Sequence, residues 1–158
     1  MTFLDRFILG KPIYRGVIEW LILLVVAVLG EVYSWGEIPF RPYSIIIGCI
    51  VIVGAFALHI YCHRIHHQAN EKSSDIGVVV TTGIFGKIRH PMYLSLILMN
   101  FGFAVAWGIY WIFLPVFLFS ISNALVAIRE EKFLVGKLGS QYKEYMRQVP
   151  WRFIPKIF

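Results

Sequence analysis

The sequence predicts an all-α integral membrane protein, with four transmembrane helices followed by a cytoplasmic amphipathic helix and a tail. Three observations support this prediction. Hydrophobic residues make up 58% of the 158 residues, and charged residues only 15%, whereas a soluble domain carries roughly 25% charge. The apolar residues are gathered into long runs, as in chains that cross a hydrocarbon core about 30 Å thick. Basic residues lie almost entirely on one side of those runs.

The apolar runs give the bounds of the expected spans, which are about 16–33, 43–61, 92–107 and 110–128. A glycine- and proline-containing turn separates the first two runs, and Gly108 separates the last two. After residue 129 the chain becomes charged, with apolar residues at helical spacing, so residues 130–148 are predicted to form one amphipathic helix. We expect residues 1–158 to form a single membrane domain.

The basic residues predict the orientation of this bundle. Fourteen of the 15 lysines and arginines lie before the first run, between the second and third, or after the fourth, and only Arg41 lies elsewhere. The positive-inside rule then places both termini in the cytoplasm, together with residues 78–93 and 129–155. The net charge of +6 is accordingly interpreted as topology and contact with anionic lipid, and not as nucleic-acid binding.

Residues 80–93 are the polar, glycine-containing stretch around which the rest of the chain is organised. Pro91 stands where the third span should begin, and proline is favoured at the first position of a helix. The unpaired N–H groups and the positive dipole end of that helix would favour an anion. Arg89 and His90 add positive charge at the same place.

Antiparallel packing of the third and fourth spans would place this helix start beside Glu130 and Glu131. A pocket with both signs of charge suits a zwitterionic ligand, because the helix start can take a carboxylate and the acids can take an ammonium group or ribose hydroxyls. The alternative is a charged membrane boundary held together by internal ion pairs. The residues alone leave both interpretations open.

Several polar residues lie within the apolar runs. Glu19 is expected to reach the membrane interface, since it lies near the start of the first run. Asn100 and Asn123 are expected to form hydrogen bonds between helices, with Asn123 alternatively lining the inner end of the pocket. A histidine cluster ends the second span, where His59, His63 and His66 share a helix face. Zinc or haem iron could bind such a cluster, but no further ligand is evident, and we predict no metal site.

The residues from 83 to 93, followed by a hairpin and then Glu130-Glu131, resemble the signature of the integral-membrane methyltransferases. That superfamily includes the isoprenylcysteine carboxyl methyltransferases and the phospholipid N-methyltransferases. Its pattern of glycine, Arg-His-Pro-x-Tyr, paired acids, spaced tyrosines and a Val-Pro turn is matched in order and spacing over about residues 78–155. Phe85 departs from the usual tyrosine, and Leu138 from the usual phenylalanine.

The resemblance implies S-adenosylmethionine as the cofactor, bound at the cytoplasmic face. By motif position, Val80 and Gly83 would contribute backbone contacts near the adenine, and His90 and Tyr93 would contact the methionine part. The polar groups of the cofactor would be bound by Glu131, together with Glu130. The acceptor would be lipophilic and embedded in the membrane, either an isoprenylcysteine-type carboxylate or a phospholipid-type amine.

Candidate catalytic residues depend on which acceptor is used, because the sulfonium already activates the methyl group. Arg129 or Arg152 could orient a carboxylate, while Glu130 or His90 could remove a proton from an amine. Residues 124–128 lack the arginine that carboxyl-methylating relatives tend to carry about one turn before the acidic pair. Two other functions stay open, namely a lipid-binding protein without turnover and a redox membrane protein that uses the histidine cluster. Neither the acceptor nor the oligomeric state follows from the sequence.

Overall fold

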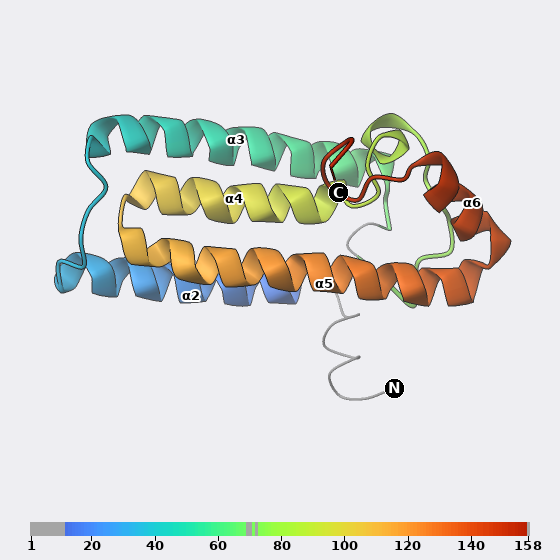
Figure 1. Cartoon of the computed structure of the whole chain (residues 1–158), viewed down its shortest axis with the longest axis horizontal. Coiled ribbons are helices and arrows are strands. Elements are labelled where there is room, and N and C mark those ends of the chain that lie inside the picture. Colours follow the sequence, from blue (N-terminus) through green and yellow to red (C-terminus); the bar gives the residue numbers. More distant parts are fainter. Residues whose placement is uncertain (1–11, 69–70, 72, 158) are drawn as a thin grey trace.

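The computed structural model describes residues 12–68, 71 and 73–157, and regular structure in this part of the chain is entirely helical. Four long helices run side by side, and a short helix and the C-terminal tail cover one end of the bundle (Figure 1). The long helices are α2 (Pro12–Val32), α3 (Arg41–Ile65), α4 (Pro91–Trp107) and α5 (Phe113–Leu138). The short elements are the 3-10 turns η1 (Gly83–Gly86) and η2 (Tyr110–Ile112), and helix α6 (Ser140–Gln148). Arg6, Lys11 and Lys72, which enter the orientation argument, lie outside the described residues.

Three of the helices are long and apolar enough to cross a membrane, over Ile13–Val32, Arg41–Ile65 and Tyr110–Leu138. The fourth apolar helix, α4, has 17 residues, or about 25 Å at 1.5 Å per residue. Each predicted span therefore coincides with a helix, although α4 is shorter than an ordinary membrane-crossing helix.

The predicted amphipathic helix over residues 130–148 is not one element. Helix α5 continues without a break from the fourth apolar run through Glu130 and Glu131 to Leu138. The chain turns at Gly139, which has a φ of +59°, a conformation that glycine adopts readily because it has no Cβ. Helix α6 then begins at Ser140. The acidic pair consequently lies on the long helix α5 and not on α6.

Glycines allow α3 and α4 to approach each other closely. A Cβ atom on Gly48 would lie 2.3 Å from the backbone nitrogen of Ala106, and one on Gly102 would lie 3.1 Å from the carbonyl oxygen of Gly48. Small residues at such crossings are typical of helix pairs in membranes, where close van der Waals packing drives association. This contact fixes the position of α4, whose first residues carry the site described below.

Polar side chains connect α2 to the hairpin of α4 and α5. Glu19 on α2 accepts hydrogen bonds from the Nδ2 atoms of Asn100 at 2.8 Å and Asn123 at 3.0 Å. The expectation of hydrogen bonds between helices is therefore confirmed for both asparagines. The expectation that Glu19 reaches the interface is wrong, because its side chain is buried against two other helices.

We expect Gly48→Ala to destabilise the bundle, because the new methyl group would overlap the backbone of α4. Overpacking of this kind costs about 1–3 kcal/mol, which should lower the midpoint of thermal unfolding in detergent, followed by circular dichroism. Gly54→Ala is the matched control, since it lies on the same helix and its Cβ would meet nothing within 4 Å. Equal midpoints for the two variants would contradict the close contact between α3 and α4.

Candidate functional site

The candidate site lies at the end of the bundle where α4 begins and α5 passes beside it (Figure 1). Pro91 is the first residue of α4, and the C-terminal tail runs alongside the residues before it. The backbone N–H groups of Arg89 and His90 donate to the carbonyl oxygens of Trp151 and Arg152, each at 2.9 Å. These two N–H groups, which precede the first turn of α4, are therefore satisfied by the tail.

Glu131 holds these segments together through its side chain. Its Oε1 atom lies 2.7 Å from Nε of Arg89 and 3.0 Å from Nε2 of His90, and its Oε2 atom lies 3.0 Å from Nη2 of Arg152. Arg89 also donates from Nη1 to the carbonyl oxygen of Val149 at 2.7 Å. The Glu131 side chain is only 4% exposed. One buried carboxylate thus joins α5 to the start of α4 and to the tail.

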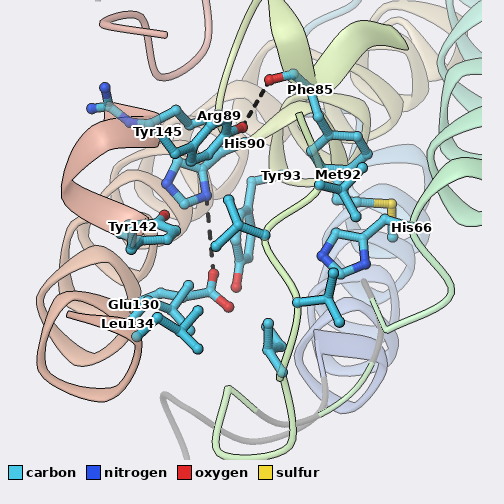
Figure 2. A pocket seen from close by; sticks show the side chains of 15 residues that line it. His66, Phe85, Arg89, His90, Met92, Tyr93, Glu130, Leu134, Tyr142 and Tyr145 are labelled. Atoms are coloured by element: carbon cyan, nitrogen blue, oxygen red, sulfur yellow. Dashed lines mark hydrogen bonds and ion pairs between the residues drawn. The ribbon is translucent and has the colours of Figure 1, made fainter. Parts of the chain in front are cut away.

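A solvent-open cavity with an empty volume of about 550 Å³ lies beside this cluster (Figure 2). Its walls come from the end of α3, the loop before η1, the start of α4, the far part of α5 and helix α6. Apolar and aromatic side chains dominate the lining, including Val80, Phe85, Leu134, Tyr142 and Tyr145. The cavity therefore combines an apolar interior with a small number of polar groups, as ligand sites commonly do.

Glu130 supplies the acidic group of the cavity wall. Its Oε1 atom accepts a hydrogen bond from Oγ of Ser73 at 3.1 Å, and its Oε2 atom lies 4.0 Å from Nδ1 of His90. The hydroxyl of Tyr93 also interacts with this carboxylate. In Figure 2 the carboxylate points toward His90 and Tyr93. His90 therefore stands between two acids, with Glu131 behind it and Glu130 in the cavity.

Three other titratable side chains of the lining, His66, Tyr142 and Tyr145, are kept uncharged by burial. Burial lowers the pKa of His66, and the nearby Glu130 carboxylate opposes this only in part. Burial, reinforced by the charges of Glu131 and Glu130, raises the pKa of Tyr142 far above its usual value. Burial likewise raises the pKa of Tyr145, whose hydroxyl donates to the carbonyl oxygen of Phe85 at 2.8 Å. Both phenols therefore stay protonated.

The structure brings together four of the residues singled out from the sequence. Val80, His90, Tyr93 and Glu130 all line the cavity, while Gly83, Arg129, Glu131 and Arg152 are not among its lining residues. Gly83 opens η1 with a φ of +61°, and a Cβ there would lie 2.5 Å from the side chain of Ile65. Its conformation and its closeness to α3 both require glycine.

The sequence did not indicate that Ser73 binds Glu130 or that His66 lines the cavity. Ser73 lies in an irregular loop, and its contact with Glu130 spans 57 positions in the chain, so no local pattern could reveal it. His66 was assigned to the histidine cluster, but its ring packs on Phe85 with 5.4 Å between centroids. The pairing of His66 with η1 depends on how the loop folds back over α3.

The other histidines of the cluster have structural contacts. Among the described residues, no group of three or more histidine, cysteine or acidic side chains is arranged to hold a metal. His59 Nδ1 lies 2.9 Å from Oγ of Ser95, and Ser95 donates its proton to the carbonyl oxygen of Met92 at 2.6 Å. His59 Nδ1 must then be the donor to Ser95. This histidine therefore ties α3 to α4.

Comparison with known proteins decides the family. The model of the family described as "Phospholipid methyltransferase" matches residues 43–141. The chain belongs to this family. Apart from Tyr142 and Tyr145, every residue that lines the cavity lies within the matched stretch. The resemblance to membrane methyltransferases found in the sequence is thereby confirmed. The long apolar helices make this family member a multi-pass membrane protein.

A second similarity is partial. The chain is 31% identical over 83 residues to a Delta(14)-sterol reductase from Mus musculus. The aligned stretch covers 51% of this chain and 20% of the reductase, so the chain spans about a fifth of that protein's length.

We expect Glu131→Gln to destabilise the protein by about 3–5 kcal/mol, because breaking a buried ion pair leaves its partners uncompensated. The tail should also become accessible to protease, since Arg152 would lose its anchor. The measurements are thermal unfolding and limited proteolysis in detergent. Glu144→Gln is the control, because it disrupts an exposed ion pair with Arg147 on α6, and such pairs contribute little. A tail equally protected in both variants would refute the anchoring role of Glu131.

Proposed function

We propose that this protein is an S-adenosylmethionine-dependent methyltransferase that acts on a lipophilic, membrane-embedded acceptor. The observation that carries the proposal is the cavity, whose wall is built almost entirely from the segment matched by the family. Its walls include the start of α4 and the far part of α5, at one end of the bundle of apolar helices, where a lipid headgroup and a polar cofactor could meet.

The lining fits the chemical parts of S-adenosylmethionine. The carboxylate of Glu130 suits an ammonium group or ribose hydroxyls, and aromatic faces such as those of Phe85 and Tyr142 suit the adenine and the positive sulfonium. When bound, the cofactor supplies a methyl group already activated for attack, so the protein need not supply a nucleophile. Positioning of the reactants and exclusion of water would then be the main contributions of the protein.

The two acids have different tasks in this proposal. Glu130 contacts the cofactor directly and is held by Ser73 and Tyr93. Glu131 acts through His90 and Arg89, whose side chains it fixes at 3.0 Å and 2.7 Å. Val80, which lines the cavity, would contribute backbone near the adenine.

For an amine acceptor, Glu130 is the proposed proton acceptor, since its carboxylate faces the cavity and can take a proton from the nitrogen. For a carboxylate acceptor, Arg129 or Arg152 would orient the substrate. Arg152 is engaged with Glu131, and Arg129 lies on the exposed side of α5. The arrangement of the described residues therefore favours the amine.

The proposed arrangement in the membrane has four crossings. The short helix α4 would cross together with α5 as a hairpin whose turn contains Gly108 and η2. Both termini and the cofactor cavity would then face the cytoplasm, as the distribution of basic residues predicts. The partners are the bilayer and a lipid or lipid-anchored acceptor, and no nucleic acid.

We expect S-adenosylmethionine, but neither NADPH nor Zn²⁺, to raise the midpoint of thermal unfolding, because only the first matches the charges of the cavity. Glu130→Gln should weaken cofactor binding at least about tenfold by calorimetry, which corresponds to about 1.4 kcal/mol. Glu37→Gln, in the turn at the opposite end of the bundle, is the control. Stabilisation by NADPH alone would favour a reductase instead.

Transfer itself is tested with labelled S-adenosylmethionine and a total lipid extract. A labelled lipid identifies the acceptor and distinguishes N-methylation from O-methylation. Cofactor binding without any labelled product would indicate a lipid-binding protein that does not turn over.

A further inference from the structure

Arg15, in the first turn of α2, is a buried cation whose hydrogen bonds are incomplete. Its residue exposure is 7%. Nη2 donates to the hydroxyl of Tyr93 at 3.3 Å, and the guanidinium carbon lies 5.4 Å from the centre of the Tyr93 ring. Nε and Nη1 are buried and have no hydrogen-bond partner in the part of the chain that the structure describes.

The nearest acid on the same helix does not satisfy these nitrogens. Glu19 attracts Arg15 through its charge, but its two oxygens accept from Asn100 and Asn123. Buried donors without partners are rare in native proteins and unfavourable, especially when they carry charge. The guanidinium therefore presents two donors to a group that the described residues do not provide.

Arg15 lies near two cavities, although it is among the lining residues of neither. Tyr93, which it contacts, lines the cofactor cavity. The next residue, Gly16, lines a second cavity with an empty volume of about 1080 Å³, formed between α2, α3 and α4. Leu96 also lines this second cavity, and it follows Tyr93 by nearly one helical turn. The two cavities are thus neighbours along α4.

The second cavity is apolar except at one point. Its wall consists of aliphatic and aromatic side chains, such as Val17, Trp20 and Phe103, together with the single polar side chain of His59. Of the helices that form it, α2 and α3 are long and apolar enough to cross a membrane. Helix α4 is apolar over a shorter length. Hydrocarbon is therefore the matching occupant for this space.

We propose that the second cavity holds the hydrocarbon chain of the acceptor lipid and that Arg15 binds an anionic group, a phosphate or a carboxylate, next to the cofactor cavity. The inference rests on the proposed function for its biological meaning. A guanidinium is always charged and matches the oxygens of both anions. An anion at this position would supply the missing acceptors and place the lipid headgroup beside Tyr93.

The test measures lipid binding directly, so that it does not depend on turnover. Purified protein in neutral detergent is titrated with hexadecyl phosphate, palmitate and hexadecanol, which share a chain and differ in headgroup. We expect the wild-type protein to bind at least one of the two anionic lipids at least tenfold more tightly than hexadecanol. Preference for the phosphate would point to a phospholipid acceptor, and preference for the carboxylate to an isoprenylcysteine-type acceptor.

Three variants assign the preference to its source. Arg15→Gln should abolish the headgroup preference, whereas Arg41→Gln, which removes an arginine at the other end of the bundle, should retain it. Val17→Trp should fill the apolar cavity and weaken binding of all three lipids alike, with the preference unchanged. If Arg15→Gln fails to fold, Val17→Trp and the titration of the wild-type protein with the three lipids still test the inference.

Equal affinity of the wild-type protein for the three lipids would overturn the inference, as would a preference that survives Arg15→Gln. Calorimetry with S-adenosylmethionine separates this failure from a failure of the proposed function. If Arg15→Gln loses the preference for anionic lipids and keeps normal affinity for the cofactor, the result supports an acceptor site at Arg15. A wild-type protein that binds the lipids as expected but not the cofactor would refute the proposed methyltransferase and leave the lipid site standing.

Discussion

The buried carboxylate of Glu131 is the interaction on which the rest of the site depends. It contacts Arg89, His90 and Arg152, which come from the start of α4 and from the tail. Without Glu131, the side chains of Arg89, His90 and Arg152 would lie close together at the end of the bundle. These groups would be partly removed from water and would have no carboxylate to compensate their charge. With Glu131, the tail is held over α4 and the cavity has a closed side.

Two acids that are adjacent in the sequence are separated by the geometry of the helix that carries them. Successive residues on an α-helix point about 100° apart, so Glu130 and Glu131 cannot face the same space. Because α5 continues through both residues to Leu138, one side chain turns to the cavity and the other to the ion pairs. If α5 ended at Arg129, where the sequence composition changes, one continuous helix would no longer hold Glu130 and Glu131 in different directions.

The four long helices were predictable from the sequence, because long apolar runs and basic flanks report directly on membrane-crossing helices, whereas the division of residues 130–148 between α5 and α6 was not. The meeting of His90 with Glu130 and Glu131 followed from the antiparallel hairpin alone. Contacts that depend on how each helix is rotated about its axis were not predictable. Glu19 looked like an interfacial residue because its depth could be estimated from the sequence. The sequence could not show that Asn100 and Asn123 face it from the neighbouring helices.

The pairing of the tail with the start of α4 has a consequence for how the protein is made. The carbonyl oxygens of Trp151 and Arg152 complete the hydrogen bonds of Arg89 and His90, yet these tail residues leave the ribosome only after all four long helices have been synthesised. The helices can therefore enter the bilayer while the nascent chain still lacks a finished pocket. The candidate site can therefore be completed only after the four long helices have been made.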